Sequence, residues 1–223
     1  MTEPIDDEEL EDDYDEADDS YPLYRGATND PIFGLLLAVA VSVGLMPLIG
    51  TGGADVRYTL TWGMLALFGV LAWLFGDEDA NRISQERPDN VVWGVVFGLV
   101  LGVPLLLFGG GTLTEMSRAM FPNMTSGVVL GYLIFIIPIA ETLFFRGVLQ
   151  RTRPFWEVGL YGTGWSLLQI FPLINQNALP LVAGFMLIMA NMLYSYVHDR
   201  NGLAAAWVCQ ITINLLLFFV PIL

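Results

Sequence analysis

One acidic side chain interrupts a long apolar stretch of this 223-residue sequence. It is Glu141, and Arg146 follows five residues later. An ionisable residue inside a membrane span costs roughly 2.5–3.5 kcal/mol on insertion scales, so it faces the bundle interior or a wet cavity. Pro138 cannot bond the carbonyl of Ile134 and should kink the helix beside this carboxyl group. A kink beside this carboxyl group could open a polar cavity, where a carboxylate could act as a general base.

Simpler explanations of this pair stay open. Glu141 could make a buried hydrogen bond that only stabilises the fold. It lies about 140° from Arg146 around an α-helix, so the two do not pair along one face. Thr142 does share a face with Arg146, because the two are four residues apart. Arg146 could also extend toward the cytoplasmic headgroups, since Arg151 and Arg153 follow it.

The last apolar segment contains a second polar pair. Gln210 and Asn214 are four residues apart and so share one helix face. Gln210 lies about nine residues beyond Asn201 and Glu141 about nine residues before Gln150, so both lie roughly 14 Å from the same membrane face. Because the two segments enter the membrane in opposite directions, they place Glu141 and Gln210 at similar depth. The pair could belong to a site, or it could be the interhelical contact that amide side chains often make in membrane bundles.

Composition predicts the elements that position these residues. Hydrophobic residues make up 55% of the chain and charged residues only 14%, with a mean hydropathy of +0.59. A soluble domain has about 25% charged residues, which it needs to face water. We therefore predict an all-α transmembrane bundle. Apolar stretches long enough to cross about 30 Å of hydrocarbon predict about seven spans, at residues 31–49, 58–76, 91–109, 126–150, 157–174, 179–197 and 203–222. The run Gly109–Gly111 is expected to be a flexible loop after the third span.

The N-terminal segment differs from the rest of the chain. Residues 1–20 hold 12 of the 23 acidic residues and none of the nine basic ones. Such a run repels itself and has too little apolar surface to offset the entropy of ordering. We predict an acidic disordered tail over residues 1–30 and a transmembrane bundle over residues 31–223. The tail could instead dock a basic partner.

Several functional classes lack their signatures. The chain has one cysteine, Cys209, and one histidine, His198, which excludes an internal disulfide and an ordinary His/Cys zinc site. It has no Walker loop, dinucleotide fingerprint or basic nucleic-acid patch. We therefore expect no metal, no cofactor and no nucleic-acid partner, with membrane lipid as the surroundings.

The distribution of arginine predicts the orientation. With seven spans, six arginines fall on the N-terminal side and two on the opposite side, which favours a cytoplasmic N-terminus and an external C-terminus in a cell membrane. The six are Arg25, Arg82, Arg87, Arg151, Arg153 and Arg200; the two are Arg57 and Arg118.

A family resemblance adds to these expectations. The run from Glu141 through Arg146-Gly147 to Gln150 resembles the first motif of the CPBP family, the type II CAAX prenyl endopeptidases and their bacteriocin-processing relatives. Gln210 and Asn214 match the spacing of the family's third motif. The resemblance covers residues 126–220. It implies an intramembrane endopeptidase with a site open to the cytosol, acting on a membrane-bound or lipidated peptide.

The resemblance also implies residue roles. Glu141 would be the general base, Arg146 the motif arginine and Asn214 an oxyanion donor. This chain departs from the family pattern at three positions. Thr142 replaces the second glutamate, Gln210 replaces the third-motif histidine, and Leu173 falls where the second-motif histidine belongs, with Gln169 in the aromatic position.

Three functions therefore remain open. A Gln amide can supply oxyanion donors, but a leucine cannot hold the attacking water, so hydrolysis by a CPBP-like peptidase would be weakened or lost. A non-catalytic membrane protein could use the same cavity to bind a partner. A small carrier could use Glu141 to relay protons. The enzyme predicts a polar pocket that joins Glu141 to Gln210 and Asn214 and opens to the cytosol, whereas the binding protein allows these groups to satisfy one another.

Overall fold

The structure is a computed structural model that describes residues 31–48, 53–74, 88–170, 172 and 179–223. The predicted tail and Leu173 lie outside the described residues. Every described element is helical. The elements are α1 (Pro31–Gly44), a 3-10 turn (Met46–Leu48), α2 (Ala54–Leu74), α3 (Pro88–Met120), α4 (Ser126–Gly131), a π-helix (Tyr132–Ile136), α5 (Ile137–Glu141), a second π-helix (Thr142–Val148), a 3-10 turn (Leu149–Arg151), α6 (Phe155–Ile170), α7 (Leu179–Asn201), α8 (Leu203–Asn214), a third π-helix (Leu215–Phe219) and a 3-10 turn (Val220–Ile222).

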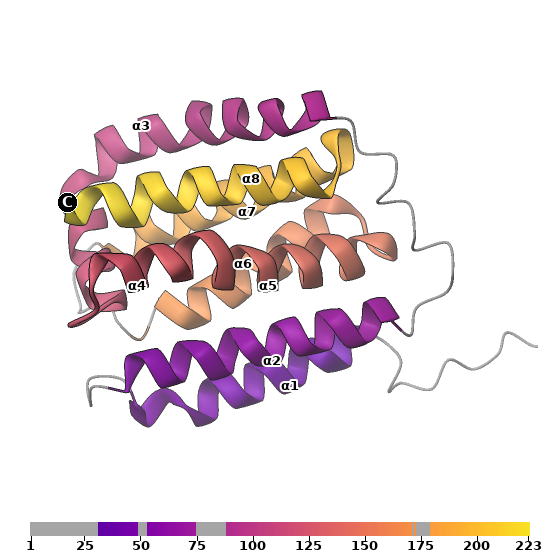
Figure 1. Cartoon of the computed structure of the whole chain (residues 1–223), viewed down its shortest axis with the longest axis horizontal. Helices are drawn as coiled ribbons and strands as arrows, with labels where there is room; N and C mark the ends of the chain where they lie inside the picture. Colours follow the sequence, from indigo (N-terminus) through magenta and orange to yellow (C-terminus); the bar gives the residue numbers. More distant parts are fainter. Residues whose placement is uncertain (1–30, 49–52, 75–87, 171, 173–178) are drawn as a thin grey trace, which may run out of the picture.

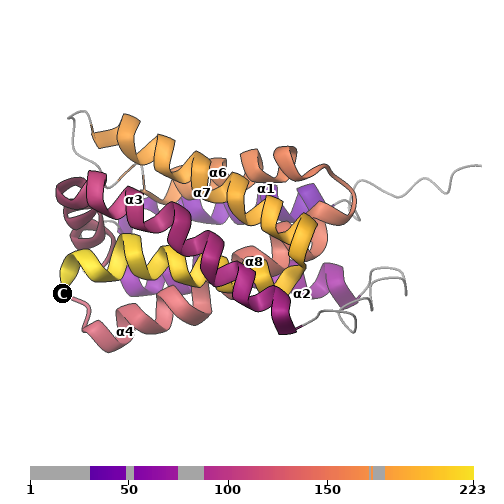
Figure 2. The same ribbon diagram turned by 90° about the horizontal axis from the view of Figure 1, so that it is seen from above.

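The helices form one bundle with their axes in roughly one direction (Figure 1). The α1–α2 pair lies on one side and α3 on the other, with α5 to α8 between them. The view from above shows α3 crossing obliquely over α8 (Figure 2). Helix α2 packs against α5 and the second π-helix, and α8 packs against α3 and α7. The segment that carries Glu141 therefore lies inside the bundle.

Four described helices are long and apolar enough to cross a membrane: Ala54–Leu74, Asp89–Met120, Ser126–Arg151 and Leu203–Ile222. The outer surface is apolar as well, with Leu107 76% and Phe108 92% exposed. A chain that exposes large apolar side chains along its helices suits lipid rather than water. The chain is thus an all-α membrane protein. Helix α1 has only 14 residues, or about 21 Å, which is shorter than the hydrocarbon core.

Two expectations about polar or glycine-rich positions were wrong. Gly109–Gly111 is not a loop but part of α3, which continues to Met120. In lipid the backbone has no other hydrogen-bond partner, so a helix is favoured over a loop even at glycines. Arg57 and Arg118, counted above as loop residues, lie within α2 and α3, and Arg57 is buried.

Glycines bring α8 close to α3. Gly94, Gly98 and Gly102 recur every four residues along α3 and so lie on one face. A Cβ atom at Gly98 would lie 2.7 Å from Cβ of Thr212, and one at Gly102 would lie 2.6 Å from Cδ1 of Leu216. The backbone of α8 can approach only because these side chains are absent. This contact fixes the helix that carries Gln210 and Asn214.

The helix around Pro138 widens instead of simply bending. The N–H of Ile137 bonds the carbonyl of Tyr132, five residues back, as in a π-helix. In this register the missing N–H of Pro138 leaves the carbonyl of Leu133 without its helical partner, one residue earlier than the expected Ile134. A π-helix follows Glu141 as well. Both irregular turns border the carboxyl group that the sequence singled out.

Candidate intramembrane carboxylate site

Glu141 lies at the end of α5 and is 5% exposed. Its Oε1 accepts a hydrogen bond of 3.0 Å from the indole nitrogen of Trp62, on α2. Its Oε2 accepts a bond of 2.6 Å from Nε2 of Gln210, on α8. The carboxyl group thus joins three helices. Gln210 lies at the same depth as Glu141, as counting residues from the helix ends predicted.

The amide of Gln210 is held on both sides. While its nitrogen donates to Glu141, its oxygen accepts a bond of 2.9 Å from the hydroxyl of Thr142. An ionised carboxylate only accepts hydrogen bonds, so the amide nitrogen of Gln210 faces Glu141 and the hydroxyl of Thr142 donates to the amide oxygen. The adjacent residues of one helix therefore orient a single side chain of another.

Asn214 lies one turn further along α8 and is also buried. Its Nδ2 donates to the carbonyl of Leu133 at 3.4 Å, a long bond. This is the carbonyl whose helical partner the ring of Pro138 removes. Asn214 therefore compensates for the irregular turn, and one N–H of its amide makes no bond within the described chain. The same side chain faces the pocket that contains Glu141.

Arg146 lies inside the bundle and does not extend to the headgroups. It is 0% exposed and donates from Nη2 to Oδ1 of Asn191, on α7, at 2.9 Å. The guanidinium group also lies 5.2 Å from the ring centre of Tyr194. It forms no ion pair with Glu141 in the described chain, although Nη1 approaches the backbone carbonyl of that residue at 3.5 Å. Among the four predicted site residues, Arg146 is the one that does not line the pocket.

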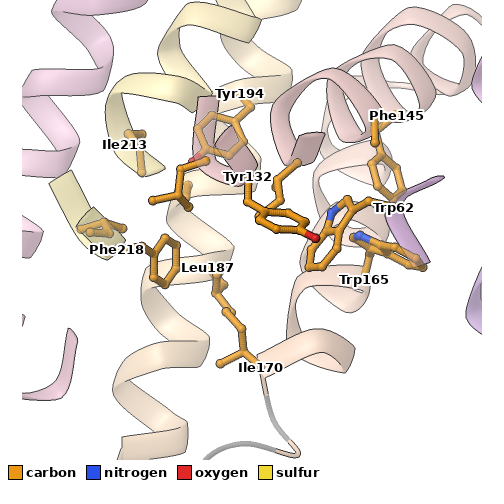
Figure 3. Packing of buried hydrophobic residues seen from close by; sticks show 14 of the residues in the cluster. Trp62, Tyr132, Phe145, Trp165, Ile170, Leu187, Tyr194, Ile213 and Phe218 are labelled. Carbon is orange, nitrogen blue, oxygen red and sulfur yellow. The ribbon is translucent and has the colours of Figure 1, made fainter. Parts of the chain in front are cut away.

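A cavity of about 40 Å³ joins three of the four predicted site residues, Glu141, Gln210 and Asn214. One water needs about 10–15 Å³, so the space suits about three waters or a small ligand group. The lining also includes polar side chains from α6 and α7, and the rest is apolar. Figure 3 shows Leu187, Ile213 and Phe218 on one side and Trp62 on the other. The polar residues from α6 and α7 are Ser166, Gln169, Asn191 and Tyr194.

The cavity extends toward one end of the bundle. Its lining includes Met120 and Ile170, the last residues of α3 and α6, and Phe218 near the C-terminus. That end also holds the α3–α4 connection and the C-terminus (Figure 1). The predicted topology makes it the external end, whereas the family resemblance implies a site open to the cytosol.

Sequence reasoning missed several residues at this site. Asn191 and Ser166 are polar residues within apolar helices, so the rule that identified Glu141 would also have found them. Asn191 connects Arg146 to Ser166, since its Nδ2 lies 3.2 Å from that hydroxyl. Trp62 carries no such signal, because a tryptophan in an apolar span is usually a packing residue.

The chemistry available to the site follows from its donors and acceptors. An ionised carboxylate accepts about four hydrogen bonds, and Glu141 receives two in the described chain. The remaining lone pairs can accept from a water in the cavity. The amides of Gln210 and Asn214 each keep an N–H that could donate to a substrate oxygen. Among the described residues, no group of three His, Cys, Asp or Glu side chains could hold a metal ion.

No protein-family model, curated protein or solved structure matches the chain.

Proposed function

We propose that the chain is an intramembrane hydrolase of the CPBP type, in which Glu141 activates water to cleave a peptide bond of a membrane-bound or lipidated peptide. The observation that supports this best is the shared cavity: Glu141, Gln210 and Asn214 line one small polar space inside an apolar bundle. A buried carboxylate with room for water beside two amide donors is the minimum that such hydrolysis needs.

The reaction would proceed in two steps. A water in the cavity gives a proton to Glu141 while its oxygen adds to the substrate carbonyl carbon. The resulting oxyanion accepts hydrogen bonds from the free amide N–H groups of Gln210 and Asn214. The carbon–nitrogen bond then breaks, and the protonated Glu141 returns its proton to the leaving amine. The products are a carboxylic acid and an amine, and the enzyme regains its carboxylate.

A specific observation favours the second candidate, a non-catalytic membrane protein that binds a partner in the same cavity. Both oxygens of Glu141 and both ends of the Gln210 amide already have protein partners. Polar groups whose hydrogen bonds are made this fully within the protein are also typical of a network that only stabilises the fold. Thr142 in place of a second carboxylate removes one group that would hold the attacking water. Hydrolysis by this site would therefore be slow, or lost altogether.

The same proposal includes the topology. The proposal has seven spans, a cytoplasmic N-terminus and an external C-terminus in the cell membrane. The four long apolar helices support a membrane bundle, and α1, α6 and α7 would supply the other three spans. Cys209 is the single cysteine and is buried. Replacing it with serine gives a background in which cysteines introduced at Thr152 and Met124 report the two faces. Labelling of position 124, but not 152, from outside intact cells supports this orientation; the reverse pattern contradicts it.

The activity is tested with the purified protein in detergent. Lipidated C-terminal peptides are incubated with the native protein at low and high salt, and products are identified by mass spectrometry. The test variant is Glu141→Gln, which retains the size and hydrogen bonding of the side chain: its oxygen can accept from Trp62, and the Gln210 amide can reverse because a hydroxyl also accepts. Glu115→Gln, at an exposed position on α3, makes the same chemical change outside the site.

The outcomes separate the two candidates. Loss of a general base usually lowers a rate by about 10²–10⁴-fold, so Glu141→Gln should abolish detectable product while Glu115→Gln retains it. Cleavage by Glu141→Gln at the native rate would exclude the mechanism. No product from any of the folded, monodisperse proteins would favour the binding protein.

A further inference from the structure

A second pocket lies at the end of the bundle that holds the α3–α4 connection and the C-terminus (Figure 1). Its walls come from the end of α3, the connection that follows, α4 and the last 3-10 turn. The pocket measures about 210 Å³, against about 40 Å³ for the cavity at Glu141, and the two share no lining residue. One water needs about 10–15 Å³, so this pocket has room for a polar group together with several carbon atoms.

Arg118 is the charged residue of this pocket. Among the described residues, no other charged side chain lines it. Arg118 is exposed, and within the described chain its guanidinium group has no hydrogen-bond partner and forms no ion pair. Glu115, three residues earlier in α3, does not line the pocket. The N–H donors of Arg118 are therefore available to an anionic ligand.

The position of Arg118 along α3 places it at the depth of the lipid headgroups. No charged residue occurs between Asp89 and Glu115. The segment from Asp89 to Met120 has 32 residues, or about 48 Å, which exceeds a hydrocarbon core of about 30 Å even at a tilt of about 40°. The end of α3 that carries Arg118 therefore extends beyond the hydrocarbon, into the layer where the phosphate groups of phospholipids lie.

The rest of the lining combines one free hydroxyl with apolar side chains. Ser126 is exposed, and its hydroxyl can donate to a bound anion. Ser117 cannot, because its hydroxyl bonds the carbonyl of Leu113 at 2.8 Å. The apolar lining residues are Phe121, Met124, Val129 and Ile222. These side chains can cover the carbon atoms of a lipid, whereas a free phosphate ion would gain nothing from them.

We propose that Arg118 and Ser126 bind the phosphate group of a membrane phospholipid in this pocket. A guanidinium group suits this role, because its planar N–H donors match two phosphate oxygens and the hydrogen bonds are charge-assisted. The glycerol carbons of the lipid lie against the apolar wall, and the acyl chains continue into the bilayer. A bound lipid holds the end of α3, the start of α4 and the last turn together. This site does not depend on hydrolysis at Glu141.

The test is lipid-dependent thermal stability of the purified, delipidated protein in a non-ionic detergent. The protein is titrated with dioctanoylphosphatidylglycerol, with dioctanoylglycerol, which lacks the phosphate, and with inorganic phosphate at constant ionic strength. A ligand that binds the folded state raises the unfolding temperature in a saturable manner. We expect this rise with the phospholipid alone, because only this probe carries both the phosphate group and the carbon chains.

Variants separate the pocket from general attraction of lipid to a charged surface. Arg118→Met should weaken the affinity for the phospholipid by about tenfold without changing the unfolding temperature in its absence. Ser126→Phe keeps Arg118 but fills the pocket, so it should abolish the rise. Arg200→Met is the control: it removes the same charge from an exposed position at the other end of the bundle and should respond like the native protein.

The proposal is overturned if the phospholipid produces no saturable rise, or if dioctanoylglycerol produces the same one. An equal rise with inorganic phosphate would assign the pocket to the free ion and exclude the lipid. Native affinity in either Arg118→Met or Ser126→Phe would show that the phospholipid binds elsewhere.

Discussion

The carboxamide nitrogen of Gln210 lies 2.6 Å from a carboxylate oxygen of Glu141, although 69 residues separate the two in the chain. Both side chains are buried among apolar residues, where each would be costly without a partner. The bond therefore fixes the register of α8 against α5. It also determines which atoms face the cavity, because an amide that donates to Glu141 presents its nitrogen there. The same hydrogen bond therefore holds α8 in place and orients the amide that the proposed hydrolysis would use.

Thr142→Val tests how this amide is oriented. The variant removes the hydroxyl that bonds the Gln210 oxygen and leaves that oxygen unpaired, at an expected loss of about 1–3 kcal/mol in unfolding free energy. Any hydrolysis should decrease further, because the amide can then rotate away from Glu141. Equilibrium unfolding in mixed detergent micelles measures the first effect, and the peptide cleavage assay measures the second.

Thr163→Val is the matched control for this change. Thr163 is also buried, but its hydroxyl bonds the carbonyl of Gly159 in its own helix. That bond is not between helices, so its loss should change unfolding much less and leave cleavage unaltered. Equal effects of the two substitutions would show that the orientation of Gln210 is unimportant.

Hydropathy predicted the described helices to within a few residues at most ends, because a segment in lipid must satisfy its backbone hydrogen bonds within its own helix. It failed at Gly109–Gly111, where local glycine preference was outweighed by the absence of water. Counting residues along each helix placed Glu141 and Gln210 at similar depth, which is compatible with the contact that the structure shows. The contact with Trp62 could not be predicted in this way, since depth does not determine which helices are neighbours. The burial of Arg57 was missed for the same reason.

Substitutions of Arg146 and Asn191 should have strongly coupled effects on the unfolding free energy. Asn191→Leu leaves a buried guanidinium without its 2.9 Å acceptor, and an unsatisfied buried group costs about 1–3 kcal/mol, or more when it is charged. Arg146→Met removes the charge itself, after which Asn191→Leu should cost much less. A double-mutant cycle in mixed micelles measures this coupling. Additive effects would show that the two side chains act independently.

The position of Asn191 also depends on a glycine. A Cβ atom at Gly162 would lie 2.6 Å from Oδ1 of Asn191 and 3.4 Å from Nη2 of Arg146. Gly162→Ala should therefore displace this contact and destabilise the fold by about 1–3 kcal/mol, as overpacking does. Gly164→Ala, two residues away with open space around it, should be neutral or slightly stabilising. Unfolding of both variants under the same conditions gives the comparison, and a loss of stability in Gly164→Ala as large as that in Gly162→Ala would contradict it.

The last prediction concerns the close packing of α3 against α8 at Gly98. Gly98→Ala places a methyl group 2.7 Å from Cβ of Thr212, so the two helices must separate or shift. We expect a loss of about 1–3 kcal/mol in unfolding free energy, because the contact is made with a β-branched side chain that cannot move aside. Gly110→Ala, on the same helix with open space around it, controls for the general preference of alanine over glycine and should be neutral or stabilising. If Gly98→Ala were as stable as Gly110→Ala, α3 would not hold α8 in place, and the position of Gln210 would depend on Glu141 and Thr142 alone.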